Sequence, residues 1–388
     1  MIEIREKANC CGCGGCVQIC PKQCIRLLVD NEGFSYPHVD TTVCVDCGLC
    51  ENVCPVLNQS KQRRPLSISL AVNKNEAIRL RSSSGGIFTL LAERIISEGG
   101  VVFGAKFDES WNVVHDYTET IAGLEAFRGS KYVQSVIGNN YRKAKQFLGE
   151  GRKVLFSGTP CQIAGLKKFL KKEYTNLLTV DVVCHGTPSP LIWQDYLTYR
   201  RTRAIRENKV ELPQIVDISF RDKTSGWKNF GFKICFSDSC QITPFNKDLF
   251  MRGFLKNIYL RPSCYACAAR SGKSCSDLTL ADFWGVEQTH PQMHDDKGAS
   301  LVLTYTQKGY QALDLQCAEV EVATYDEAIT YNPCIEKNCK QPFNRALFFQ
   351  LYEKEGISAI SKCVSMLRPS LLQRCLRFAK RVKNRLAR

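Results

Sequence analysis

The residues of this sequence that could do chemistry are first of all its cysteines, and ten of the 22 fall within residues 10–54. Two runs among them have the spacing C-x2-C-x2-C-x3-C-P, which is typical of proteins that hold a pair of [4Fe–4S] clusters. In such a pair the fourth cysteine of each run ligates the other cluster. The spacing therefore predicts one cluster on Cys10, Cys13, Cys16 and Cys54, and a second on Cys44, Cys47, Cys50 and Cys20.

Residues 1–57 are accordingly expected to form a small bacterial-type dicluster ferredoxin domain. Gly12, Gly14, Gly15 and Gly48 lie in or beside the runs, where left-handed backbone angles let N–H groups approach the cluster sulfides. A pair of structural zinc sites is the alternative, because zinc also uses C-x2-C pairs. The doubled run, with a proline after each fourth cysteine, favours iron–sulfur clusters. Cys11 and Cys24 fit neither run and are interpreted as packing residues.

A third cysteine site is expected from segments that lie far apart in the sequence. Cys161 stands between a strand-like segment at 153–158 and a helical segment, and Cys184 ends the next strand-like segment. A unit of this length predicts two parallel strands whose carboxyl ends share one sheet edge. Cys264 and Cys267 add a C-x2-C pair, for which Cys275 could substitute in part. Four such ligands would hold a third [4Fe–4S] cluster; structural zinc or buried free thiols are the alternatives.

The remaining cysteines show no ligand spacing. No apolar run reaches the length of about 18 residues that a membrane span needs, and the N-terminus MIEIREKANC has no apolar signal segment. These features predict a cytoplasmic chain with reduced thiols. The cysteines interpreted as packing or surface residues are Cys235, Cys240, Cys317, Cys334, Cys339, Cys363 and Cys375.

A run of small polar residues suggests an anion site. Ser82, Ser83, Ser84, Gly85 and Gly86 precede a helical segment at 87–99. Hydroxyls, free N–H groups and the positive helix end suit a pyrophosphate, although an ordinary serine-capped helix would look the same. The segment 129–135 adds Ser130, Lys131 and Tyr132, which could contact a ribose, a phosphate or a ring.

Residues 66–330 alternate strand-like and helix-like segments, which predicts an α/β domain of mixed α+β character. Strands are expected at 100–107, 153–158, 177–184, 215–220 and 300–305, and helices at 87–99, 161–172, 189–201 and near 246–257, with an inserted hairpin at 219–238. The expected organisation is a ferredoxin domain at 1–57, a linker at 58–65, two parts of a catalytic domain at 66–150 and 151–330, and C-terminal helices with a basic tail at 331–388.

The basic charge of the chain is concentrated at one end. Residues 368–388 carry eight Lys and Arg residues and no acid, which leaves +7 of the formal +15 for residues 1–367. Three oxidised clusters on twelve cysteines, at about −2 each, would bring that part to about +1, so a nucleic-acid partner is not expected. The tail has one apolar helical face, which is typical of a helix at a membrane surface or of one docked on its own domain.

Eight ordered motifs resemble the family of coenzyme F-420 hydrogenase and dehydrogenase beta subunits. They are SSSGGIF (82–88), GGVVFGA (99–105), GSKYVQS (129–135), FSGTPCQIAGL (156–166), VDVVCHGTPSP (180–190), FRDKTSGW (220–227), RPSCYAC (261–267) and DLTLADFWG (277–285). The sequence is most similar to the bacterial branch found with exopolysaccharide biosynthesis genes. The resemblance implies FAD with a [4Fe–4S] cluster beside it, so that the residues of 82–86 and 130–132 line the flavin. Thr159 and Pro160 would then bring cluster and flavin together.

These inferences form one functional hypothesis. Electrons enter through the two N-terminal clusters, pass to the third and reduce FAD, which exchanges a hydride with an organic substrate such as a deazaflavin or a polysaccharide precursor; the flow could also run in reverse. A ferredoxin-like or other redox donor is the expected partner. His185 is the candidate proton donor, and Asp222, Lys223, Trp227 and Asp282 are further candidates for the substrate pocket. The competing hypotheses are an electron-transfer subunit without its own substrate and a zinc-stabilised interaction protein.

Overall fold

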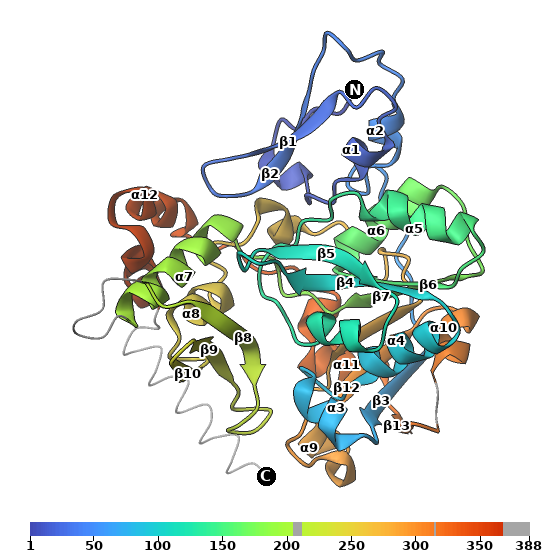
Figure 1. The fold of residues 1–388 in the computed structure, drawn as a ribbon, viewed down its shortest axis with the longest axis vertical. Helices are drawn as coiled ribbons and strands as arrows, with labels where there is room; N and C mark the ends of the chain where they lie inside the picture. The colour runs from blue at the N-terminus through green and yellow to red at the C-terminus, as the bar shows by residue number, and fades with distance from the viewer. Residues whose placement is uncertain (205–211, 314–315, 368–388) are drawn as a thin grey trace.

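The computed structural model describes residues 1–204, 212–313 and 316–367, and it places a small cysteine-rich module above a larger body (Figure 1). The module contains α1 (Gly15–Ile19), α2 (Leu49–Asn52) and an antiparallel hairpin of β1 (Ile25–Val29) and β2 (Ser35–Val39). Gly14 and Gly48 each precede a helix with a φ of 70°, so each cysteine loop enters its helix through a left-handed residue that glycine tolerates best. Gly12 has a positive φ as well, whereas Gly15 is the first residue of α1 and does not.

An eight-stranded mixed sheet runs through the body in the order β13-β3-β12-β11-β7-β6-β4-β5. Four neighbouring strands are parallel: β4 (Val101–Phe107), β6 (Val154–Gly158), β7 (Leu177–Val182) and β11 (Leu278–Asp282). The other four pair in antiparallel fashion: β5 (Val113–Thr118), β12 (Ser300–Thr304), β3 (Ser67–Asn73) and β13 (Ala318–Val322). The predicted mixed α/β class and the parallel arrangement around Cys161 are therefore confirmed.

Helices cover both faces of this sheet. On one face, α4 (Ile87–Ser97) buries Leu91 and Ala92 against the sheet. On the other face, α5 (Asn140–Gly149) and α6 (Pro160–Leu170) bury Tyr141 and Phe169. A capping box between Thr159 and Gln162 starts α6, with Pro160 at its first turn. Smaller helices flank the sheet: α3 (Glu76–Arg81), α9 (Val286–Thr289), α10 (Gln307–Ala312) and α11 (Tyr325–Tyr331).

A second, three-stranded sheet packs beside the first. It is built from β8 (Ile215–Asp222), β9 (Gly231–Phe236) and β10 (Ser239–Pro244), so the predicted hairpin gains a third strand. Its aromatic core is shared with α7 (Pro190–Arg203), α8 (Leu249–Leu255), α12 (Arg345–Glu355) and α13 (Ala359–Met366). Cys235 and Cys240 face each other across β9 and β10 and form a disulfide. Cys235 is buried and Cys240 is exposed, as expected of packing or surface cysteines. The expectation that the thiols are reduced is wrong for this pair, because strand register places the two residues opposite each other.

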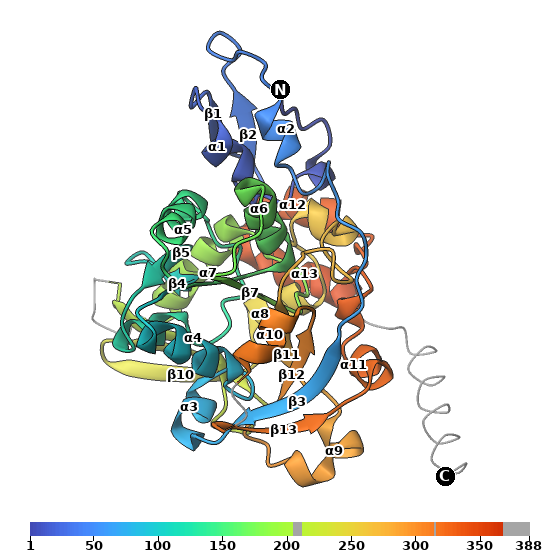
Figure 2. The same cartoon turned by 90° about the vertical axis from the view of Figure 1, so that its right-hand side faces the viewer.

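The module is fixed to the body by polar contacts as well as by the chain. Arg345 on α12 forms a two-pronged ion pair with Glu32 of the module, at 2.9 and 2.6 Å. The predicted linker 58–65 runs along the side of the body from the module to β3 (Figure 2). Within it, Arg63 donates to the carbonyls of Gly272 and Ser276 at 3.0 and 2.8 Å. The linker is therefore anchored to the body by its own arginine.

Among the described residues, no helix is both long and apolar enough to cross a bilayer. The basic tail 368–388, with Cys375, lies outside the described residues.

Candidate cofactor and metal sites

The module brings together the cysteines expected to bind its second cluster. Cys20, Cys44, Cys47 and Cys50 line one cavity, which agrees with the crossed assignment in which Cys20 leaves its own run. Cys24 also lines this cavity, and its sulfur lies 3.4 Å from that of Cys20. It is therefore a close neighbour of the proposed ligands, which the sequence spacing did not indicate.

The cysteines expected to bind the first cluster gather on the side of the module that faces the body. Burial, followed by the nearby thiolates of Cys10 and Cys54, raises the pKa of Cys16 to about 12. Cys13 is buried and rests on α6, where a Cβ added to Gly165 would come within 2.9 Å of the Cβ of Cys13. Glycine at this position of α6 therefore allows the cysteine loop to approach the helix backbone closely.

The third set of cysteines also converges. Burial raises the pKa of Cys184 well above its usual range, and the thiolates of Cys264, Cys161 and Cys267 add to this effect. Burial likewise raises the pKa of Cys264 to about 11, and Cys161 and Cys267 contribute. The backbone N–H of Thr187 donates to the sulfur of Cys264 at 3.3 Å. Segments far apart in the sequence thus place four half-buried thiols near one another at the carboxyl edge of the parallel strands.

Cys275 does not belong to this group. Its thiol contacts the carbonyl of Lys273 in its own loop at 3.7 Å, and within the described part of the chain no contact joins it to the four cysteines. The sequence alone could not separate it from Cys264 and Cys267.

Two residues that sequence reasoning missed connect the module to this region. The thiol of Cys11 is half-buried and hydrogen-bonds with that of Cys161. Arg261, which is 1% exposed, donates to the carbonyl of Cys10 at 2.7 Å and to that of Ser35 at 2.9 Å, and its guanidinium lies 3.5 Å from the sulfur of Cys10. The module therefore touches the third cysteine set directly through Cys11, which lies beside the first residue of its first cysteine run.

A cavity of about 650 Å³ opens beside the third cysteine set, which is within the range of roughly 300–1,000 Å³ typical of ligand pockets. Cys184 and His185 form part of its wall. The predicted flavin residues that line it are Ser82, Ser83, Ser84, Gly86, Ser130, Lys131, Tyr132 and Thr159. Gly85 and Pro160 do not: Gly85 packs against β3 and β12, and Pro160 forms the first turn of α6.

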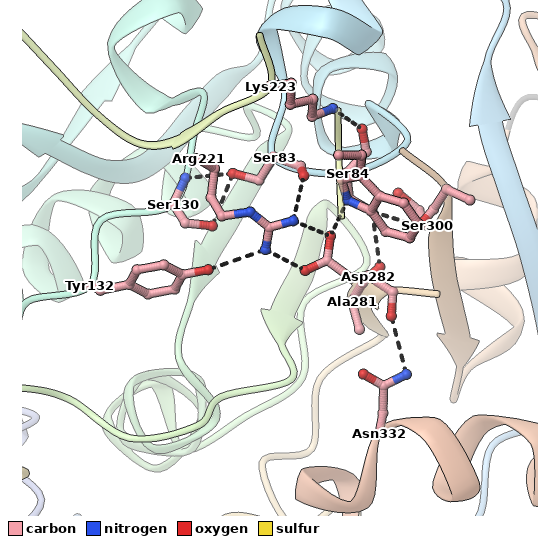
Figure 3. Close-up of polar contacts among 12 residues, drawn as sticks. Ser83, Ser84, Ser130, Tyr132, Arg221, Lys223, Ala281, Asp282, Ser300 and Asn332 are labelled. Carbon is pink, nitrogen blue, oxygen red and sulfur yellow. Dashed lines mark hydrogen bonds and ion pairs between the residues drawn. The ribbon is translucent and has the colours of Figure 1, made fainter. Parts of the chain in front are cut away.

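An arginine and an aspartate form the polar centre of the cavity wall (Figure 3). Arg221 on β8 donates to both carboxylate oxygens of Asp282 at 2.9 and 3.3 Å and to the hydroxyl of Tyr132 at 3.4 Å. Its guanidinium also lies over the rings of Phe230 and Trp284. The FRDKTSGW motif contains Arg221, but no spacing rule distinguishes it from the neighbouring charges.

Two half-buried lysines hold the serine-rich loop and its neighbour. Lys131 donates to the carbonyls of Ala126 and Arg128 at 2.7 and 2.8 Å. Lys223 donates to the carbonyl of Ser84 at 3.0 Å and to two further carbonyls (Figure 3). Burial lowers the pKa of each of these lysines to about 7.

Of the four further residues expected in the substrate pocket, Asp282 alone is among those that line this cavity. Lys223 supports the loop from outside. Asp222 accepts a hydrogen bond from the N–H of Thr224 in a turn, and Trp227 is buried and stacks on Trp284.

The environment of His185 differs from the expectation. Its Nε2 lies 2.6 Å from the side-chain oxygen of Asn257, and its Nδ1 lies 4.0 Å from the sulfur of Cys334. Cys339 donates a hydrogen bond to the His185 carbonyl. Cys334 and Cys339 were interpreted as packing or surface residues, and Cys339 does pack in the core. Both also belong to a cluster with His185 whose three ligand atoms lie within 4.8 Å of one another. The chain folds back after α11 and so brings the two cysteines close to His185. The spacing of residues in the sequence does not predict this contact.

Comparison with known proteins assigns the two parts of the chain. Residues 9–58 match the 4Fe-4S dicluster domain, and residues 151–328 match the C terminus of the coenzyme F420 hydrogenase/dehydrogenase beta subunit. A 41-residue segment, 11% of this chain, is 49% identical to a 7Fe ferredoxin of Hydrogenibacillus schlegelii and covers 46% of it.

Two longer relatives are archaeal. The coenzyme F420-dependent sulfite reductase of Methanocaldococcus jannaschii is 26% identical over 200 residues, which cover 50% of this chain and 30% of the relative. A subunit of the F420H2 dehydrogenase of Methanosarcina mazei is 21% identical over 194 residues, which cover 47% of this chain and 55% of the relative. The chain thus matches less than two thirds of the length of either protein.

The two matched domains make this chain similar to iron–sulfur electron-transfer oxidoreductases. More specifically, residues 151–328 are similar to the C terminus of coenzyme F420 hydrogenase/dehydrogenase beta subunits, and they follow a segment that matches a 4Fe-4S dicluster domain.

One residue of the cavity wall gives a prediction for pH. His115 is buried between the Ser157 carbonyl at 3.0 Å and the Ser135 hydroxyl at 2.9 Å, and burial lowers its pKa to about 4. As the pH falls, His115 is protonated in the unfolded chain before it is protonated in the folded protein, because its pKa is lower in the folded protein. Protonation in this pH range therefore favours the unfolded chain, and the protein loses stability on acidification. Between pH 7 and about pH 5.5 the free energy of unfolding should fall by about 1 kcal/mol on this account.

The His115→Gln variant should lack this part of the pH dependence in anaerobic denaturant titrations at the two pH values. His38, which is exposed on β2, provides the control: His38→Gln should keep the full loss. Equal losses in the wild type and in His115→Gln would show that His115 is not the group responsible.

Proposed function

We propose that this protein is an iron–sulfur flavoprotein oxidoreductase that carries electrons between its N-terminal [4Fe–4S] clusters and FAD through a third cluster, and that FAD serves an organic substrate. One observation carries the proposal: the third cysteine set lies between the dicluster module and the 650 Å³ cavity. Cys161 touches Cys11 of the module, and Cys184 forms part of the cavity wall. When bound, the clusters would supply single electrons, and the flavin would supply the conversion between single electrons and a hydride.

The residues of the third set suit an iron–sulfur cluster. Four half-buried thiols near one another are costly to ionise in the absence of metal, as the raised pKa values of Cys184 and Cys264 show. Thiolates bound to iron gain stabilisation that offsets this cost. The N–H of Thr187 on the sulfur of Cys264 and the guanidinium of Arg270 near Cys184 supply the positive charge that such an anionic group needs.

The cavity wall suits FAD. It offers the hydroxyls of the 82–84 loop and of Ser130, which fit a ribityl chain or a pyrophosphate. The Nε of Arg221 is buried and has no hydrogen-bond partner among the described residues, so a ligand carbonyl or phosphate oxygen would satisfy it. The apolar and aromatic part of the wall, with Phe230 and Trp284, fits the flavin ring.

His185 is the proton donor in this proposal, because it lies on the cavity wall directly after Cys184. The side-chain oxygen of Asn257 lies against its Nε2 and thereby fixes the orientation of the ring.

A deazaflavin substrate is supported by the names of the archaeal relatives, whereas a polysaccharide precursor is supported by the sequence resemblance alone. The second candidate function is an electron-transfer subunit that passes electrons to a partner. It is supported by one relative that is named as a subunit.

Iron content tests the third cluster. Anaerobically purified protein should contain about 12 irons per chain, four for each cluster, and Cys161→Ser should contain about eight. Cys317 is exposed, so Cys317→Ser is the matched control and should keep about 12. A wild-type content of about eight irons would exclude the third cluster.

Flavin retention tests the cavity assignment. Arg221→Gln should weaken FAD binding about tenfold, because the buried guanidinium no longer donates to the flavin. Arg203→Gln, on the exposed side of α7, should have no effect. For both variants, the measurement is the amount of FAD that stays with the protein after ultrafiltration. FAD is quantified by absorbance and expressed relative to the iron content. Protein that contains its full iron but no flavin would support the electron-transfer subunit, as would flavin that reacts with no small hydride acceptor.

Arg261 gives a prediction for the first cluster of the module. Arg261→Met removes a positive charge and an N–H group 3.5 Å from the sulfur of Cys10, so the reduction potential of this cluster should become more negative. The free energy of unfolding should also fall by about 3 kcal/mol, because the carbonyls of Cys10 and Ser35 lose their hydrogen-bond donor.

Arg345→Met also breaks a contact between module and body but touches no cysteine, so it should weaken docking and leave the potential unchanged. Redox titrations followed by electron paramagnetic resonance would show the difference; equal potentials in the wild type and Arg261→Met would contradict the assignment.

A further inference from the structure

The cluster of Cys334, Cys339 and His185 lies outside the twelve proposed iron ligands. Cys334 follows the short turn at Pro333 and lines the 650 Å³ cavity, whereas Cys339 is 8% exposed. The two sulfur atoms lie within 4.8 Å of each other and of an imidazole nitrogen of His185. His185 directly follows Cys184, so this thiol pair lies beside the third cysteine set, and Cys334 and Cys184 line the same cavity.

A buried cation completes the environment of the pair. Arg270 donates to the carbonyl of Cys334 and, at 3.1 Å, to the carbonyl of His185, and its guanidinium lies 4.0 Å from the sulfur of Cys339. A positive charge at this distance favours a thiolate, and the thiolate is the form that attacks another sulfur. The same charge repels a divalent cation, which would find three ligand atoms here among the described residues. The surroundings therefore favour sulfur redox chemistry over a metal ion.

We propose that Cys334 and Cys339 are a redox-active pair that interconverts between a dithiol and a disulfide and stores two electrons beside the cavity. On closing, the S–S bond forms, both S–H bonds break and two protons are released. The two electrons pass, one at a time, to a one-electron oxidant such as ferricyanide or the oxidised clusters. On opening, a low-potential electron donor such as dithionite or the reduced clusters supplies two electrons, each sulfur takes one, and two protons are taken up. The inference rests on the proposed function only where it takes the clusters as the electron source or acceptor within the chain. The formation of the disulfide does not depend on the proposed function.

Alkylation and peptide mass spectrometry of the anaerobic holoprotein test the proposal. After mild oxidation with ferricyanide, the peptide containing both cysteines should carry no alkyl group and should be lighter by two hydrogen atoms. After reduction with dithionite it should carry two alkyl groups. Cys317, which is exposed, should be alkylated under both conditions, and in Cys339→Ser the remaining Cys334 should stay free of an intramolecular bond.

Repeating the experiment in buffers of oxidised and reduced glutathione separates this inference from the proposed function. A pair that opens and closes in these buffers, in protein that proves to lack flavin or the third cluster, would support the inference although the proposed function fails. Two cysteines that are alkylated at every potential would overturn it. Protection of both cysteines that ends when a chelator releases one zinc per chain would overturn it as well and would identify a metal site.

Discussion

The structure depends on one constraint, which is the position of Cys161 at the first turn of α6. This turn is fixed by the end of β6, by Pro160 and by the capping box of Thr159 and Gln162. Cys13 of the module packs against the same helix at Gly165. Thr159, which precedes the helix, is one of the residues that line the cavity. Module, third cysteine set and cavity therefore share one rigid element, and a shift of α6 would change all three contacts together.

Buried arginines give the protein its electrostatic organisation. Arg221, Arg261, Arg270 and Arg345 are each less than 9% exposed, although burial of an unpaired guanidinium is strongly unfavourable. Arg221 and Arg345 are paired with carboxylates. Arg261 and Arg270 instead lie against cysteine sulfur atoms and satisfy their donors mainly on backbone carbonyls. Their charge is thus available to anionic sulfur, which fits the excess of negative charge that thiolate-bound clusters would bring.

The sequence predicted what depends on local spacing and on hydrophobic runs. The strands around Cys161 and Cys184 lie where their apolar runs predicted them, and the rule for parallel strands correctly placed both cysteines at one sheet edge. The module followed from the two cysteine runs in the same way. Gly85 and Pro160 were misplaced because neighbours in a turn point to different sides, and the backbone conformation decides which of them reaches the cavity.

The residues that sequence reasoning missed are those whose partners come from a different part of the fold. Cys11 meets Cys161 only because the module docks on α6, and Arg261 reaches Cys10 only because the 261–267 loop lies beneath the module. Cys334 and Cys339 approach His185 after the chain has formed β11, β12 and β13 of the large sheet. All of these contacts lie on the borders between the three cysteine sets and the cavity. Residue spacing thus defines the individual sites, whereas the connections between them are a property of tertiary packing. The proposed electron exchange between the sites would depend on those connections.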